Sequence, residues 1–233
     1  MVVLNVKNTM IERVLEIIAP HPCISCGKVG LILCVSCKYD IIHEPFGGCI
    51  LCEWPQKSGI CLEHGAPLEK AFVVSDRFGS LSQIIDALKL QRTRAAASVL
   101  AELLNERLPE IPGTVVLVPV PTLASHARQR GYDQVKLITR YLGALRNYSV
   151  EDVLVRTKNT TQHLVGRTER ANQAKGLYVL KDTLKIDPAV TYLLIDDIIT
   201  TGATVLEASR CIQEAGGKVW VAALAYQSKK AST

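Results

Sequence analysis

Aromatic side chains are scarce in this sequence: they make up 5% of its 233 residues, with three Phe and two Trp. Proteins that bind single-stranded nucleic acid usually combine a basic groove with stacked aromatic side chains. The composition therefore predicts at best weak and salt-sensitive binding of single-stranded DNA. Apolar runs are also short, and none approaches the roughly 18–20 residues that a membrane-spanning helix needs. We expect no membrane insertion.

A recognisable signal peptide is missing as well. Glu12 and Glu16 interrupt the apolar N-terminal pattern, and no small-residue cleavage site follows it. These features predict a cytoplasmic protein. Hydrophobic residues make up 48% of the chain and charged residues 21%, which excludes a disordered or fibrous chain and suffices for one domain with a small appendage. The net charge of +5 permits anionic partners but selects none.

Cysteine is concentrated in one part of the chain: seven of the eight cysteines lie between Cys23 and Cys61, and Cys211 stands alone. In a cytosolic protein, paired Cys-x-x-Cys units indicate metal ligands rather than disulfides. Each such turn supplies two ligands to a tetrahedral zinc ion, so four turns predict two closed zinc sites. The ligands are Cys23, Cys26, Cys34, Cys37, Cys49, Cys52, Cys61 and His64.

The spacing of these ligands does not fix how they pair. We favour a sequential arrangement, in which the first four bind one ion and the last four the other, over a crossed arrangement of alternate turns. Because all four positions of each site are filled, we expect zinc to stabilise the module rather than to catalyse a reaction. A disulfide-bonded module is the alternative. The predicted division is an N-terminal amphipathic helix (1–20), a double zinc ribbon (21–68) and a larger domain (69–233).

In the larger domain, predicted strands alternate with predicted helices. The run 115–118 is short and wholly apolar, as in a central parallel strand that is buried on both faces. This alternation predicts an α/β domain with a mostly parallel sheet, which binds ligands at the carboxyl ends of its strands. We expect strands at 71–74, 115–118, 153–156, 191–195 and 218–226, and helices at 80–107 with a break near 92–94, at 123–145 and at 203–215.

The end of the predicted strand at 191–195 carries the strongest chemical signal. It leads into Asp196 and Asp197, then into a loop of small and hydroxyl-bearing residues and the start of a helix. Backbone N–H groups at a helix N-terminus, together with Thr hydroxyls, make an anion site sized for a phosphate. The carboxylates need partners of their own, and ribose hydroxyls or a hydrated Mg²⁺ suit them. The segment thus predicts a site for a phosphorylated ribose, with an ordinary N-capped helix as the alternative. The loop residues are Thr200, Thr201, Gly202, Ala203 and Thr204.

Two further segments are candidate parts of this site. Pro119 and Val120, followed by Pro121, come directly after the predicted strand at 115–118, where a tight turn and a cis or strained peptide are possible. The segment from 156 to 178 is polar and too long for a simple connection, which is typical of a mobile lid. For Arg128 and Arg130, a solvated basic face is the alternative to a role in this site. Lys89, on the helix after the first strand, could reach an anion, but we favour a solvated face for it.

Together these motifs resemble those of the ComF family of competence-associated, phosphoribosyltransferase-like proteins. The resemblance covers roughly residues 20–228. His64 stands where the family often has Cys, and Asp133 stands where Asn is usual. The motifs are the Cys-containing turns, Pro119-Val120-Pro121, Arg130-Gly131-Tyr132-Asp133-Gln134, the block Arg156…Gln162…Arg170, and the segment from Asp196 to Thr204.

The resemblance implies a type I phosphoribosyltransferase-like parallel sheet with helices on both faces, preceded by the zinc-ribbon module. It implies binding of phosphoribosyl pyrophosphate (PRPP) with Mg²⁺. Asp196 and Asp197 resemble the pair that holds the ribose hydroxyls, and residues 200–204 resemble the 5′-phosphate loop. The turn at Pro119 and Val120 faces the pyrophosphate in such enzymes. Arg128, Arg130 and Arg156 are then expected to neutralise pyrophosphate, with Asp196, Asp197 and Arg130 as the catalytic candidates.

Three functions are compatible with these features. The first is transfer of a phosphoribosyl group with release of pyrophosphate, linked to natural transformation and DNA uptake. The second is a non-catalytic PRPP sensor. The third is an adaptor that binds single-stranded DNA or a helicase-like protein of the competence machinery.

Overall fold

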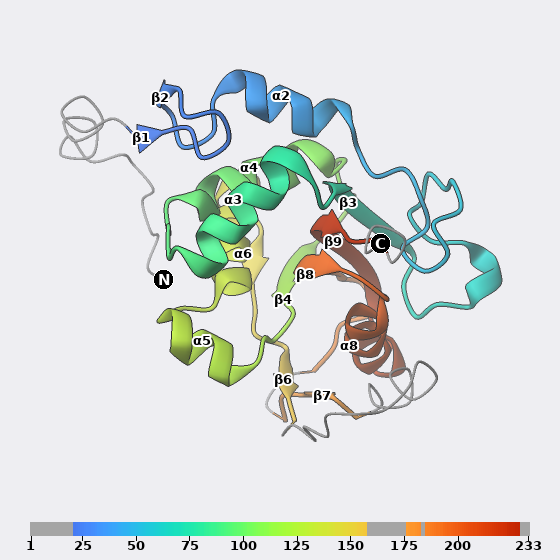
Figure 1. The fold of residues 1–233 in the computed structure, drawn as a ribbon. Coiled ribbons are helices and arrows are strands. Elements are labelled where there is room, and N and C mark those ends of the chain that lie inside the picture. Colours follow the sequence, from blue (N-terminus) through green and yellow to red (C-terminus); the bar gives the residue numbers. More distant parts are fainter. Residues whose placement is uncertain (1–20, 158–175, 183–184, 229–233) are drawn as a thin grey trace, which may run out of the picture.

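The centre of the protein is a five-stranded, wholly parallel sheet (Figure 1). The computed structural model describes residues 21–157, 176–182 and 185–228. Strand β4 is buried along its whole length, as its apolar sequence predicts for a central strand. The strands, in order across the sheet, are β3 (Lys70–Asp76), β9 (Lys218–Tyr226), β8 (Thr191–Ile199), β4 (Val115–Pro119) and β5 (Ser149–Val150).

Helices cover both faces of this sheet, which confirms the expected α/β architecture (Figure 1). Side chains alternate along β8, so that Leu193 and Ile195 join the core on one face and Leu194 joins the core on the other. The first face is covered by α3 (Gly79–Leu90), α4 (Ala96–Arg107) and α6 (Gln134–Arg146), and the second face by α8 (Ala203–Glu214).

The structure corrects three of the expected elements. The helix expected at 123–145 is two helices, α5 (Ala124–Arg130) and α6, because Gly131 ends the first with φ +80° and Asp133 caps the second. Strand β8 extends past residue 195 to Ile199 and therefore includes both aspartates. Strand β6 (Leu154–Arg156) pairs antiparallel with β7 (Tyr178–Leu180), in a ribbon apart from the main sheet. None of the described peptide bonds is cis.

The Cys-rich segment is distributed over both faces of the sheet. Its first part contains the short hairpin of β1 (His21–Pro22) and β2 (Val29–Gly30), followed by α2 (Val35–His43), and its buried side chains share a core with α3 and α4. Its second part includes the 3-10 helix η1 (Leu62–His64), and its buried side chains share the opposite core with α8. The chain crosses between the faces beside the end of β3, where the backbone N–H of Phe46 bonds to the carbonyl of Val74.

Two expectations fall on residues that the structure does not describe. These are the amphipathic helix at 1–20 and most of the polar segment between Arg156 and Tyr178. Within the described ranges, every helix is too short or too polar to cross a membrane.

Candidate functional site

The Cys-rich segment contains two clusters of four metal-ligating side chains. Within each cluster, all candidate ligand atoms lie within 4.8 Å of one another. The side chains group as the sequential arrangement expects. The clusters are Cys23, Cys26, Cys34 and Cys37, and Cys49, Cys52, Cys61 and His64.

Distances in both clusters fit zinc, and one thiol in each cluster has a lowered pKa, whereas burial and neighbouring thiols raise the pKa of Cys37 to about 12 and that of Cys61 to about 11. Tetrahedral zinc with Zn–S bonds of about 2.3 Å separates its sulfurs by roughly 3.8 Å, and the Sγ atoms of Cys52 and Cys61 are 3.8 Å apart. Burial opposes ionisation of Cys23 and of Cys49, but backbone N–H groups outweigh it and lower the pKa of Cys23 to about 6 and that of Cys49 to about 7. One such donor is the N–H of Leu51, 3.5 Å from the Cys49 sulfur. The two clusters are therefore suited to hold thiolate-bound zinc.

The adjacent aspartates of β8 lie on opposite faces of the sheet, because successive side chains of a strand alternate. Asp197 is directed to the face of α3 and α6. Its Oδ2 lies 2.8 Å from Nζ of Lys89 and accepts a 3.0 Å hydrogen bond from the side-chain amide of Gln134. Gln134 in turn accepts a 2.7 Å bond from Arg130. Asp197 is therefore a buried carboxylate whose charge is paired with Lys89 of α3 and which accepts a hydrogen bond from Gln134 of α6.

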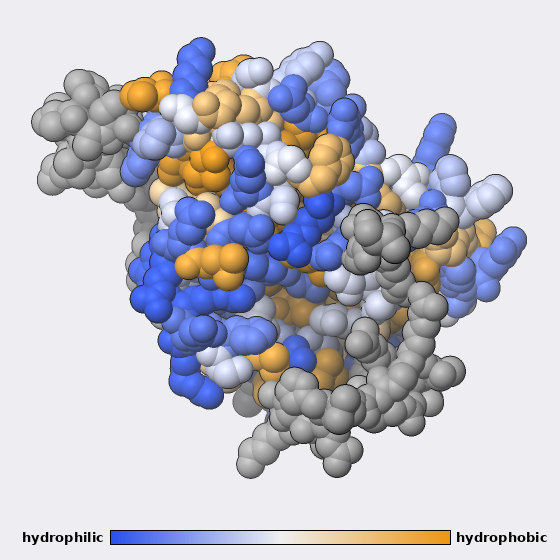
Figure 2. Space-filling model, in the orientation of Figure 1, coloured by the Kyte–Doolittle hydropathy of each residue, from blue (hydrophilic) through white to orange (hydrophobic). Residues whose placement is uncertain are grey.

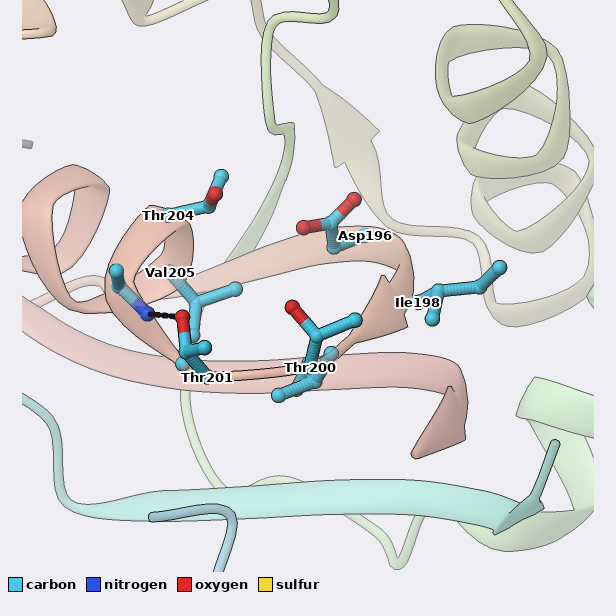
Figure 3. A pocket seen from close by; sticks show the side chains of 9 residues that line it. Asp196, Ile198, Thr200, Thr201, Thr204 and Val205 are labelled. Carbon is cyan, nitrogen blue, oxygen red and sulfur yellow. Dashed lines mark hydrogen bonds between the residues drawn. The ribbon is translucent and has the colours of Figure 1, made fainter. Parts of the chain in front are cut away.

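Asp196 instead lines a small pocket at the carboxyl end of β8 (Figure 3). Burial, together with the charge of Asp197, raises the pKa of Asp196 to about 8, although the backbone N–H of Asp197, Lys89 and Arg156 act in the opposite direction. A nearby cation or hydroxyl donors would stabilise the ionised form of a carboxyl group in this setting. The other lining residues are Ile198, Ile199, Thr200, Thr201, Gly202, Ala203, Thr204 and Val205.

The loop of this pocket leads directly into the N-terminus of α8. Gly202 is the N-cap, in the left-handed region with φ +74°, and no side chain caps the helix there. The Thr201 hydroxyl instead accepts a 3.3 Å bond from the N–H of Ala203 (Figure 3). The alternative of an ordinary helix capped by an Asp or Thr side chain is therefore wrong. The hydroxyls of Thr200 and Thr204 lie at the same pocket as the first-turn N–H groups, which lack intrahelical acceptors.

A second strand end adjoins the pocket. Strand β4 pairs with β8, and the N–H of Val120 donates to the carbonyl of Ile195, so the turn of Pro119 and Val120 lies beside Asp196. Arg156, from β6, donates to the carbonyl of Pro121 at 3.4 Å and to the hydroxyl of Tyr178 at 3.2 Å. Among the described residues, its buried Nε has no hydrogen-bond partner.

Arginines form a basic surface beside the site, over α5 and the turn between α3 and α4, where hydrophilic side chains gather in Figure 2. Arg92 and Arg94 bond to the carbonyls of Gln129 and Gly131, which joins the turn to α5. Arg128 is exposed on α5. Residues 87–101 and 120–132 contain no Asp or Glu. The predicted loop residues are thus brought together, Arg130 reaches the site through Gln134, and Arg128 lies on the outer surface.

The expectation of a solvated Lys89 was wrong, and the sequence does not predict the role of Gln134. Lys89 and Asp197 come from elements far apart in the sequence, and Gln134 lies 63 residues before Asp197. No local pattern links such residues. Gln134 lay within the motif that supports the family resemblance, which was the one available signal.

Comparisons with known proteins support the resemblance seen in the sequence. The chain is 27% identical to Competence protein F of Haemophilus influenzae over 83% of this chain and 91% of that protein. It is 29% identical to the DNA utilization protein YhgH of Salmonella typhimurium, over 85% of this chain and 86% of that protein. It is 31% identical to Competence protein ComFC of Bacillus subtilis over 43% of this chain and 39% of that protein. No protein-family model matches the chain. Together with the order of its motifs and its α/β fold, these similarities support an assignment of the chain to the ComF family.

Proposed function

We propose that this protein binds PRPP with Mg²⁺ and transfers its phosphoribosyl group to an acceptor, in support of the use of incoming DNA. The observation that carries the proposal is the pocket at the end of β8, where one carboxylate, three threonines and a helix N-terminus meet. Such an arrangement suits a phosphate next to a diol. In this proposal, residues 69–233 form the phosphoribosyltransferase-like domain.

Each part of the pocket then has a role. The first-turn N–H groups of α8 and the hydroxyls of Thr200 and Thr204 bind the 5′-phosphate, and Thr201 shapes the loop through Ala203. Asp196 accepts hydrogen bonds from the ribose hydroxyls. Asp197, fixed by Lys89 and Gln134, holds in place the end of β8 that carries Asp196.

In the proposed reaction, the bond from the anomeric carbon to pyrophosphate breaks, and pyrophosphate leaves with the electron pair as the acceptor atom bonds to that carbon. Positioning and electrostatics supply most of the catalysis. Arg156, whose Nε is buried without a partner among the described residues, and Arg130, which reaches the site through Gln134, complement the departing charge. Mg²⁺, held by Asp196 and by substrate oxygens, neutralises phosphate charge when it is bound.

The biological setting rests on the relatives. Two are named as competence proteins and others as DNA utilization proteins. The basic surface of Arg92, Arg94 and Arg128 suits an anionic partner such as single-stranded DNA, and a helicase-like competence protein is the further candidate partner. Binding to DNA through phosphate contacts alone would be strongly weakened by salt.

Calorimetric titration of PRPP with Mg²⁺ tests the proposal. We expect the zinc-loaded wild type to bind and Asp196→Asn to lose affinity by at least about tenfold, or about 1.4 kcal/mol. Asp187→Asn is the matched control, because Asp187 is exposed and precedes the opposite end of β8. Absence of binding by the folded wild type would contradict the proposal. Binding without pyrophosphate release against any nucleobase would favour a sensor.

A further inference from the structure

We propose that the first turn of the second cluster, Cys49-Ile50-Leu51-Cys52, positions the phosphate loop through Leu51. This turn and the loop are far apart in the sequence, yet Leu51 lies directly over Gly202, the N-cap of α8. The inference rests on the proposed function for the identity of the ligand, but the contact itself does not depend on it. Leu51 is a positioning residue, because it would act on the ligand through the backbone of the loop.

The contact is so close that any side chain at residue 202 would displace Leu51. A Cβ at residue 202 would lie 2.5 Å from Cδ2 of Leu51 and 3.6 Å from the carbonyl oxygen of Ile50. Real Cβ atoms essentially never approach another heavy atom within 3.0 Å. Gly202 therefore serves two needs at once, a left-handed backbone and the packing of Leu51 on the start of α8.

The turn that carries Leu51 is itself anchored to the sheet. Ile50 is fully buried, and its N–H donates to the carbonyl of Gly59 at 2.9 Å. Glu53, directly after the turn, accepts a 3.3 Å hydrogen bond from the hydroxyl of Tyr226 at the end of β9. These contacts allow the turn to support the loop rather than move with it.

On the side away from Leu51, the loop faces solvent in the described part of the chain. Thr200 and Thr201 are exposed, and the hydrogen bond between Thr201 and Ala203 lies within the loop itself. Leu51 is thus a contact from outside the loop that limits the movement of its N-cap. Because Cys49 and Cys52 bracket Leu51, a bound metal would fix the turn and therefore the loop.

Hydrogen exchange followed by mass spectrometry tests this link without any ligand. We expect Leu51→Ala to speed exchange in peptides covering 199–206 by about tenfold, which corresponds to about 1.4 kcal/mol, while peptides from β4 stay protected. Leu51→Met, of similar volume, should restore protection. Leu62→Ala is the matched control in the same module, because the Leu62 side chain is 96% exposed. Zinc content is measured for every variant.

The same peptides are followed in the wild type after a chelator removes zinc, and faster exchange confined to 199–206 is expected. Unchanged exchange there, in Leu51→Ala or after chelation, would overturn the inference. An equal rise in β4 would do so as well. Titration of PRPP with Mg²⁺ into the same proteins separates the two proposals. If the wild type does not bind PRPP but Leu51→Ala loosens the loop, the proposed function fails and the positioning role stands. If the wild type binds and Leu51→Ala binds equally with unchanged exchange, the positioning role fails alone.

Discussion

Asp196 and Asp197 are neighbours in the chain, yet they have opposite surroundings. Asp197 is paired with Lys89 and Gln134, whereas Asp196 has no cation within salt-bridge distance among the described residues. Burial and the neighbouring carboxylate therefore raise the pKa of Asp196 far above that of an ordinary carboxyl. The folded protein keeps a proton on Asp196 that the unfolded chain has already released.

This difference predicts a pH dependence of stability. Between pH 4 and about 8 the folded state binds more protons than the unfolded state, so the contribution of Asp196 to the free energy of unfolding falls as pH rises. Between pH 5 and 7, we expect the free energy of unfolding of the wild type to fall by about 1–2 kcal/mol more than that of Asp196→Asn. Urea unfolding of both proteins at several pH values measures this. Parallel pH curves for the two proteins would contradict it.

At the scale of elements, the ion pair between Lys89 and Asp197 joins helix α3 to strand β8 at the candidate site. Both side chains are mostly buried, 17% and 12% exposed. The pair of Lys136 and Asp152 has the same 2.8 Å separation, but its side chains are 37% and 41% exposed. The two pairs thus differ mainly in their access to water, which sets the cost of leaving one partner alone.

We therefore expect Lys89→Met to lower the free energy of unfolding by about 3 kcal/mol, because it leaves Asp197 buried without its cation. The matched variant Lys136→Met should cost less than about 1 kcal/mol, since water solvates Asp152. Denaturant unfolding of both variants at neutral pH makes the comparison. Equal losses would show that the burial of the Lys89 pair has no energetic consequence.

At the scale of the whole molecule, the two metal clusters differ in how they are built into the fold. Cys23, Cys34 and Cys37 belong to the core shared with α3 and α4. In the second cluster Cys52 and His64 are exposed. Cys26 of the first cluster is exposed as well, but its other three ligands are buried, so a chelator should remove zinc from the second site in the folded protein and from the first site mainly after the core opens.

Zinc release to an excess of colorimetric chelator should accordingly occur in a fast and a slow phase of equal amplitude, one for each cluster. The fast phase empties the second cluster without loss of helical structure. The slow phase follows global unfolding, recorded by the fluorescence of buried Trp220 in a Trp54→Phe variant. A single phase, or a slow phase faster than unfolding, would contradict this assignment.

The sequence by itself determined the features that depend on neighbours along the chain. Apolar runs predicted β4 and β9, the Cys-x-x-Cys turns predicted both clusters, and the segment from Asp196 to Thr204 predicted the pocket. Each is encoded within a few residues, where backbone geometry and solvent exposure leave few alternatives. The single helix expected at 123–145 was wrong, because Gly131 ends a first helix there and the helical pattern does not reveal that break.

Only the tertiary structure decided which distant residues meet. It placed Asp196 and Asp197 on opposite faces, brought Lys89 and Gln134 to Asp197, and set Leu51 on Gly202. It also divided the Cys-rich segment between the two faces of the sheet. These contacts join elements separated by tens of residues. They depend on how whole helices pack on the sheet, and the local sequence does not carry that information.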